Sequence, residues 1–172
     1  MAEYGLPEYD AALLTQSPAL AGYFEATAAE AGSAKAASNW IMGELLRTLK
    51  DRGDRIDSVG ITPAALGGLI RLVESGTISG PVAKDVFEKM YGSGRIALDI
   101  VTAEGLARID DEAALESTVR EVLSRNPKAV EQYRIGKVQT FGFLVGQVMK
   151  ATRGQGNPGL VNAILRRVLE RE

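Results

Sequence analysis

Residues 139–169, QTFGFLVGQVMKATRGQGNPGLVNAILRRVL, contain two amphipathic stretches separated by a glycine-rich turn. On both sides of the turn, apolar residues recur three and four positions apart, at Phe141, Leu144, Val145, Val148, Val161, Ile164, Leu165 and Val168. This spacing predicts two helices that each bury one face. Gly154 is typical of a helix end, and Asn157-Pro158 of the cap and first residue of the next helix.

The same pattern continues upstream, and it predicts an all-α protein. Ser17-Pro18, Thr62-Pro63 and Asn126-Pro127 are further helix starts, and glycines such as Gly92 and Gly136 fit helix ends. We expect a bundle of about four or five helices, followed by a small three-helix tail. The boundary lies in the stretch 102–110, where a new helix starts with Asp110 as its cap. The predicted domains are therefore residues 1–104 and 105–172.

The composition excludes several kinds of chemistry. The 172 residues include no histidine and no cysteine, which removes Ser-His and Cys-His catalysis, disulfides and the usual zinc sites. No constellation of residues indicates an active site, although chemistry on a metal held by carboxylates stays open. No stretch is long and apolar enough to cross a bilayer, and the N-terminus has no signal-peptide pattern. We expect a cytoplasmic protein without a membrane partner.

The charge is divided unevenly along the chain. Residues 1–125 carry a formal balance of −7 and residues 126–172 one of +5, for a net charge of −2. A basic end behind an acidic body suggests contact with a polyanion. An ordinary solvated surface is the alternative interpretation.

The glycine-rich turn offers a candidate anion site. GQGNPG at residues 154–159 matches the dinucleotide-binding pattern in letters only, because a helix and not a strand is predicted before it. As a turn it would leave backbone N–H groups open at a helix start, where a phosphate could dock. Lys150 and Arg153 would flank this corner, with Arg166 and Arg167 as support. Lys137 would lie on another face of the helix that carries Lys150.

Two further patterns need interpretation. Gly142 and Gly146 lie inside a predicted helix, where each costs roughly 1 kcal/mol relative to alanine. Either another helix packs closely there, or a bulky partner approaches. The acidic run Asp110-Asp111-Glu112 fits a helix N-terminus better than a metal site.

Several motifs resemble the GatB family, one of the subunits of the aspartyl/glutamyl-tRNA amidotransferase. The C-terminal motifs are YRIGK at 133–137, GFLVGQVMK at 142–150, Asn157-Pro158 and Val161-Asn162. Upstream, Tyr9-Asp10-Ala11, Asn39-Trp40-Ile41 and Ile78-Ser79-Gly80 are similar to the helical domain that precedes the family's tail. The tail also resembles small stand-alone YqeY-like proteins, which would lack the upstream segment.

The resemblance implies a C-terminal fragment of GatB that binds tRNA at its outer corner, on the D-loop side. The parent complex uses ATP, Mg²⁺ and glutamine to convert Glu-tRNA(Gln) and Asp-tRNA(Asn) to Gln-tRNA(Gln) and Asn-tRNA(Asn). Its catalytic residues have no counterparts here, so we expect no catalytic residue, metal or cofactor in this region. The partners would be tRNA and, through the parent protein, GatA and GatC. The candidate tRNA-binding residues are Lys137, Lys150, Arg153, Gly154, Asn157, Arg166 and Arg167. The alternatives are a protein-interaction or structural module that docks onto other subunits, or a stand-alone YqeY-like protein.

Overall fold

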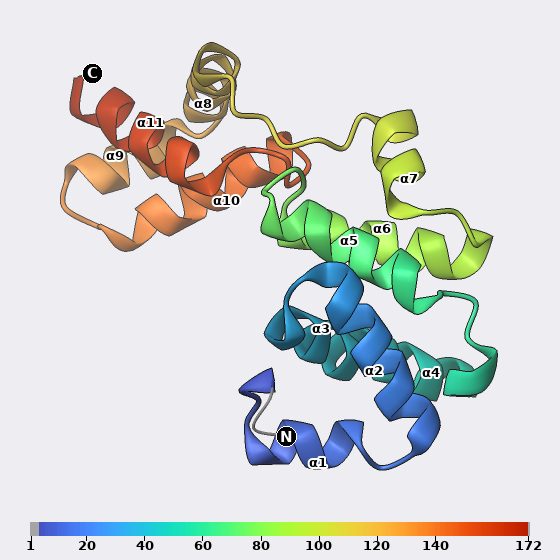
Figure 1. Ribbon diagram of the computed structural model, residues 1–172. Coiled ribbons are helices and arrows are strands. Elements are labelled where there is room, and N and C mark those ends of the chain that lie inside the picture. Colours follow the sequence, from blue (N-terminus) through green and yellow to red (C-terminus); the bar gives the residue numbers. More distant parts are fainter. Residues whose placement is uncertain (1–3, 172) are drawn as a thin grey trace. The chain divides into compact units, whose positions relative to one another are not determined.

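The computed structural model describes residues 4–171, and in this range the chain is helical. The described residues form no strand, and the one β-bridge joins Ile109 to Gly156. The all-α class is therefore confirmed. The chain, whose helices Figure 1 shows, divides into two compact units, Met1–Leu106 and Ala107–Glu172. Each unit has its own hydrophobic core. No helix in the described range is long and apolar enough to span a membrane.

The first unit contains more helices than the four or five predicted. Its described elements are α1 (Glu8–Leu14), α2 (Pro18–Ala31), α3 (Ala34–Trp40), the π-helix η2 (Ile41–Leu45), α4 (Leu46–Arg52), the 3₁₀ turn η3 (Ile56–Ser58), α5 (Pro63–Glu74), α6 (Gly80–Ser93) and α7 (Ala97–Glu104). Ser17 and Thr62 cap α2 and α5 as predicted, because their side-chain oxygens accept from the amides of Leu20 and Ala65.

The core of this unit lies where α2 crosses α5. Leu66, Leu69 and Ile70 of α5 are fully buried there. Gly67 lets the two helices approach, since a Cβ at this position would lie 2.6 Å from Cβ of Glu30. Helix α6 ends slightly later than predicted: Gly94, with φ of 69°, is the C-cap, and Gly92 lies inside the helix.

The second unit has four described helices where three were predicted. They are α8 (Glu112–Arg125), α9 (Pro127–Arg134), α10 (Gln139–Ala151) and α11 (Pro158–Arg171). Leu115 of α8, Leu144 and Val148 of α10 and Leu165 of α11 are fully buried against one another. The predicted Asn126-Pro127 start does begin α9, but the Asn126 side chain donates to the Val122 carbonyl instead of capping.

Candidate nucleic-acid interface

All seven candidate residues lie in the second unit, but Lys137 does not lie where it was predicted. Helix α10 begins at Gln139, and Lys137 belongs to the preceding turn. Gly136, with φ of 93°, allows this turn between α9 and α10. The assignment of Lys137 to the helix of Lys150 is therefore wrong, and helical periodicity does not relate their directions.

The turn between α10 and α11 has no open amides, in contrast to the prediction. Every backbone N–H between residues 153 and 161 is donated within the chain. Gly154 donates to the Met149 carbonyl at 2.7 Å, and Asn157 donates to the Ile109 carbonyl at 3.1 Å. A phosphate at this corner would have to compete with these bonds. What the turn offers at its surface is the exposed side chain of Arg153.

Asn157 and Gly154 have clear roles in folding this turn. The Asn157 Oδ1 accepts from the amide of Gly159 at 3.0 Å, and its Nδ2 donates to Asp110 at 2.7 Å. Asn157 thus caps α11 as predicted. Gly154 has φ of 75° and Arg153 has φ of 52°, so two successive residues adopt the left-handed conformation. This conformation is unfavourable for a residue that has a side chain, such as Arg153. It sets the direction in which the Arg153 side chain leaves the backbone.

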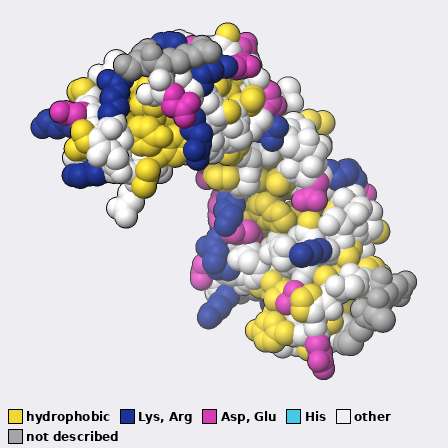
Figure 2. All heavy atoms as spheres, turned by 90° about the vertical axis from the view of Figure 1, so that its left-hand side faces the viewer, with side chains coloured by type: hydrophobic (Ala, Val, Ile, Leu, Met, Phe, Trp, Pro, Cys, Tyr) yellow, Lys and Arg dark blue, Asp and Glu magenta, His cyan; other side chains and the backbone are white. Residues whose placement is uncertain are grey.

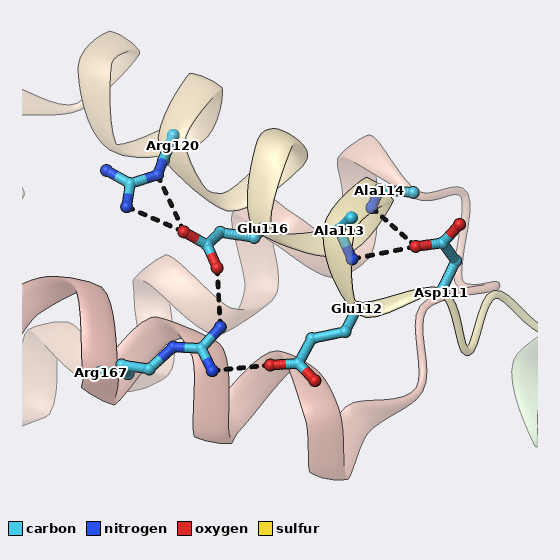
Figure 3. A network of polar contacts seen from close by, with 7 residues as sticks. All are labelled: Asp111, Glu112, Ala113, Ala114, Glu116, Arg120 and Arg167. Atoms are coloured by element: carbon cyan, nitrogen blue, oxygen red, sulfur yellow. Dashed lines mark hydrogen bonds and ion pairs between the residues drawn. The ribbon is translucent and has the colours of Figure 1, made fainter.

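Arg167 is held by two carboxylates of α8 and carries little uncompensated charge. Its guanidinium lies 2.6 Å from Glu112 and 2.7 Å from Glu116 (Figure 3). Glu116 also accepts from Arg120. The hydrogen bonds from Arg120 and then Arg167 hold the pKa of Glu116 below its ordinary value. This network joins α11 to α8, which indicates a structural role for Arg167.

The acidic run Asp110-Asp111-Glu112 lies at the start of α8 and includes Glu112, which pairs with Arg167. Asp111, and not Asp110, caps α8, because its Oδ1 accepts from the amides of Ala113 and Ala114 (Figure 3). Asp110 instead pairs with Arg108. Among the described residues, no group of three carboxylates is placed to hold a metal ion.

Helix α10 has one exposed face that the described residues of the second unit do not cover. This face carries Gln139, Gly142, Phe143, Gly146 and Lys150. A Cβ added at Gly142 or Gly146 would meet nothing within 4 Å. Packing among the described residues of the second unit therefore does not explain the two glycines. Close approach of a partner stays a prediction.

The cations around this face differ in their surroundings. In the part of the chain that the structure describes, Lys137, Lys150 and Arg153 are exposed and have no carboxylate in ion-pair distance. Arg166 lies with its guanidinium carbon 4.9 Å from the centre of the Phe141 ring. Lys150 lies in the last turn of α10, but α10 ends at Ala151 and Arg153 lies in the following turn with φ of 52°. The expectation that Lys150 and Arg153 share one helical face is therefore wrong. Figure 2 shows Lys and Arg side chains beside a hydrophobic area on this unit.

Sequence reasoning missed a hollow between α9 and α10. It has a volume of about 690 Å³ and is shallow and open to solvent. It is lined by Arg125, Asn126, Pro127, Lys128, Ala129, Gln132, Gln139, Thr140 and Phe143. The Phe143 side chain is 49% exposed. The α9–α10 turn brings these residues together, and the signal for it was Gly136.

Comparison with known proteins gives a consistent family match. A model of the GatB domain matches residues 22–169. The GatB subunit of the aspartyl/glutamyl-tRNA(Asn/Gln) amidotransferase of Trichlorobacter lovleyi is 49% identical over 169 residues, 98% of this chain and 36% of that protein. The corresponding subunits of Chlorobaculum tepidum (49% identical) and Caldicellulosiruptor saccharolyticus (50% identical) align over 99% and 98% of this chain. The chain spans about 36% of the length of these relatives.

Proposed function

The chain belongs to the GatB family, and from this premise we propose that it acts as a tRNA-binding region of an amidotransferase GatB subunit. The parent enzyme would convert Glu-tRNA(Gln) and Asp-tRNA(Asn) to the amidated forms. This region would hold the outer corner of the tRNA, on the D-loop side. Amide transfer would take place in other parts of the parent protein and in its partner subunits.

The exposed face of α10 is the observation that carries this proposal. Two glycines leave the helix backbone bare, and Lys150 and Arg153 lie at its end without a compensating carboxylate in the described residues. The sugar-phosphate backbone of RNA is bound by positive charge that replaces its counterions, and a helix surface without side chains allows it to approach closely. Arg167, which already pairs with two carboxylates, would contribute little.

Binding of a tRNA transcript at a series of salt concentrations tests the proposal. In the variant Lys150→Glu with Arg153→Glu, we expect weaker binding and a salt slope less negative by about two. The matched control is Lys35→Glu with Lys50→Glu, which changes the net charge equally at exposed lysines of α3 and α4. If both variants bind tRNA equally well, the assignment of the face is wrong.

A protein-docking role is a second candidate, and exposed apolar side chains favour it. Ile135 and Val138, in the turn between α9 and α10, are 70% and 71% exposed. Such side chains at one turn are typical of a contact with another protein. Retention of a partner subunit after nuclease treatment, and its loss in Ile135→Ser with Val138→Ser, would support this role over RNA binding.

A further inference from the structure

The hollow between α9 and α10 has the chemical make-up of a nucleobase site. Phe143 on α10 offers an aromatic ring that is 49% exposed and lines the hollow. Rings placed in this way bind unstacked bases in RNA-binding proteins, because every base has a face that can stack. The volume of about 690 Å³ lies within the range of roughly 300–1,000 Å³ typical of small-ligand sites.

Amide side chains line the same hollow as this ring. Gln132 of α9 and Gln139 of α10 both line the hollow, and in the described residues neither side chain has a protein hydrogen-bond partner. Asn126 uses its Nδ2 on the Val122 carbonyl, which leaves its Oδ1 as an acceptor. Amides present a donor and an acceptor together, which is the pattern that base edges match.

The charged side chains that line the hollow favour an anionic ligand. Lys128 lines it, and Lys137 lines a smaller depression beside it that shares Gln132, Gln139 and Thr140. No Asp or Glu is among the residues that line either one. Arg125 already pairs with Glu121 at 2.6 Å. Lys128 and Lys137 make no ion pair among the described residues, so they, more readily than Arg125, can meet phosphates on either side of a bound nucleotide.

We propose that the α9–α10 hollow holds one unpaired nucleotide of the bound tRNA, with its base on Phe143 and its edge on Gln132 and Gln139. Lys128 and Lys137 would contact the flanking phosphates. This inference rests on the proposed function. To the exposed face of α10, which would bind the RNA backbone, it adds a subsite that would recognise one base. Proteins recognise RNA sequence mainly through such splayed-out bases.

The test uses the full chain and a tRNA transcript. Its variants distinguish stacking of a base on an aromatic ring from contact with any apolar side chain. Phe143→Ala should weaken binding by roughly 5- to 150-fold, the equivalent of one lost base stack. Phe143→Tyr should bind like the parent protein, whereas Phe143→Leu should bind like Phe143→Ala because it keeps an apolar side chain without an aromatic face. The salt slope should stay unchanged in all three, since none alters charge. Lys128→Gln should make the slope less negative by about one.

Chemical probing of base edges in the tRNA gives an independent readout. One unpaired nucleotide should be protected by the parent protein and become reactive with Phe143→Ala. If Phe143→Leu binds and protects like the parent protein, base stacking is refuted and a docked protein side chain becomes the better occupant. If the Lys150 and Arg153 charge reversal weakens binding while Phe143→Ala does not, this inference fails and the proposed function stands. If the parent chain does not bind tRNA, both fail.

Discussion

The guanidinium of Arg167 on α11 lies 2.7 Å from a carboxylate oxygen of Glu116 on α8, 51 residues earlier in the chain. A second carboxylate, that of Glu112, lies 2.6 Å away on the other side of the same guanidinium. One cation thus joins the first and last helices of the second unit. A residue that looked like an RNA contact in the sequence is, in the structure, part of the packing of two helices.

Replacing Arg167 should therefore change stability and not RNA binding. In Arg167→Met we expect a lower free energy of unfolding at neutral pH, because Glu112 and Glu116 lose their shared partner. Pairing lowers the pKa of Glu116 in the folded state, so its contribution is present above the ordinary value of 4.5. It is lost as the pH falls through the lowered value.

Urea unfolding from pH 7 down to pH 3 measures this difference. The gap between the parent protein and Arg167→Met should be constant near neutrality and shrink once the pH falls below about 4.5. Arg125→Met is the matched control, since Arg125 makes an exposed pair within one helix and should change little. A tRNA salt slope that becomes less negative by about one in Arg167→Met would contradict the structural role.

Two neighbouring glycines of α5 should respond to alanine in opposite directions. At Gly67 a Cβ would lie 2.6 Å from Cβ of Glu30 and 3.1 Å from the Ala31 amide nitrogen. Gly67→Ala should therefore push α2 and α5 apart and destabilise the protein by about 1–3 kcal/mol. At Gly68 nothing lies within 4 Å, so Gly68→Ala should stabilise by roughly 1 kcal/mol. Thermal unfolding of both variants checks this, and equal melting temperatures would contradict the close crossing.

The second unit should fold without the first. It has its own buried cluster, which includes Leu115, Val119, Leu144, Val148 and Leu165, and its own bridge from Ile109 to Gly156. A chain of residues 107–172 should show a cooperative thermal transition by circular dichroism and keep its tRNA binding. A helical chain without a cooperative transition would show that its core needs the first unit. The control is residues 1–106, which should fold and bind tRNA weakly.

Local signals in the sequence predicted the starts of α2, α5, α9 and α11, because helix starts depend on residues next to one another. Ser17, Thr62 and Asn157 each cap a helix as their neighbours indicated. The candidate site was harder to predict, because its properties depend on distant contacts. Whether Arg167 is free depends on Glu112 and Glu116, and whether the 154–159 amides are open depends partly on Ile109.

The hollow between α9 and α10 shows the same limit. Periodicity places Phe143 and Lys150 on one face of a helix, but it does not say that α9 folds back beside Phe143. Gly136 marked a helix end in the sequence, and its positive φ makes the turn possible. The direction of that turn, which brings Gln132 towards Gln139, follows from the packing of α9 and α10.

The glycines of α10 give a final prediction, in which the free energy of unfolding should rise while the affinity for tRNA should fall. Gly142 and Gly146 lie in an exposed helix interior with open space around them. The double variant Gly142→Ala with Gly146→Ala should raise the free energy of unfolding by roughly 1 kcal/mol per site, because alanine restricts the unfolded backbone more.

The same variant should bind tRNA more weakly, since two methyl groups would separate the RNA backbone from the helix. Gly68→Ala is the control: it should stabilise the protein by about as much as one of the two α10 sites, without changing tRNA affinity. A gain in stability with unchanged affinity in the double variant would show that RNA does not approach this face. Loss of affinity in both variants would show that rigidity, and not contact, is what matters. Unfolding curves and tRNA titrations on the same preparations therefore decide between contact at α10 and a general effect.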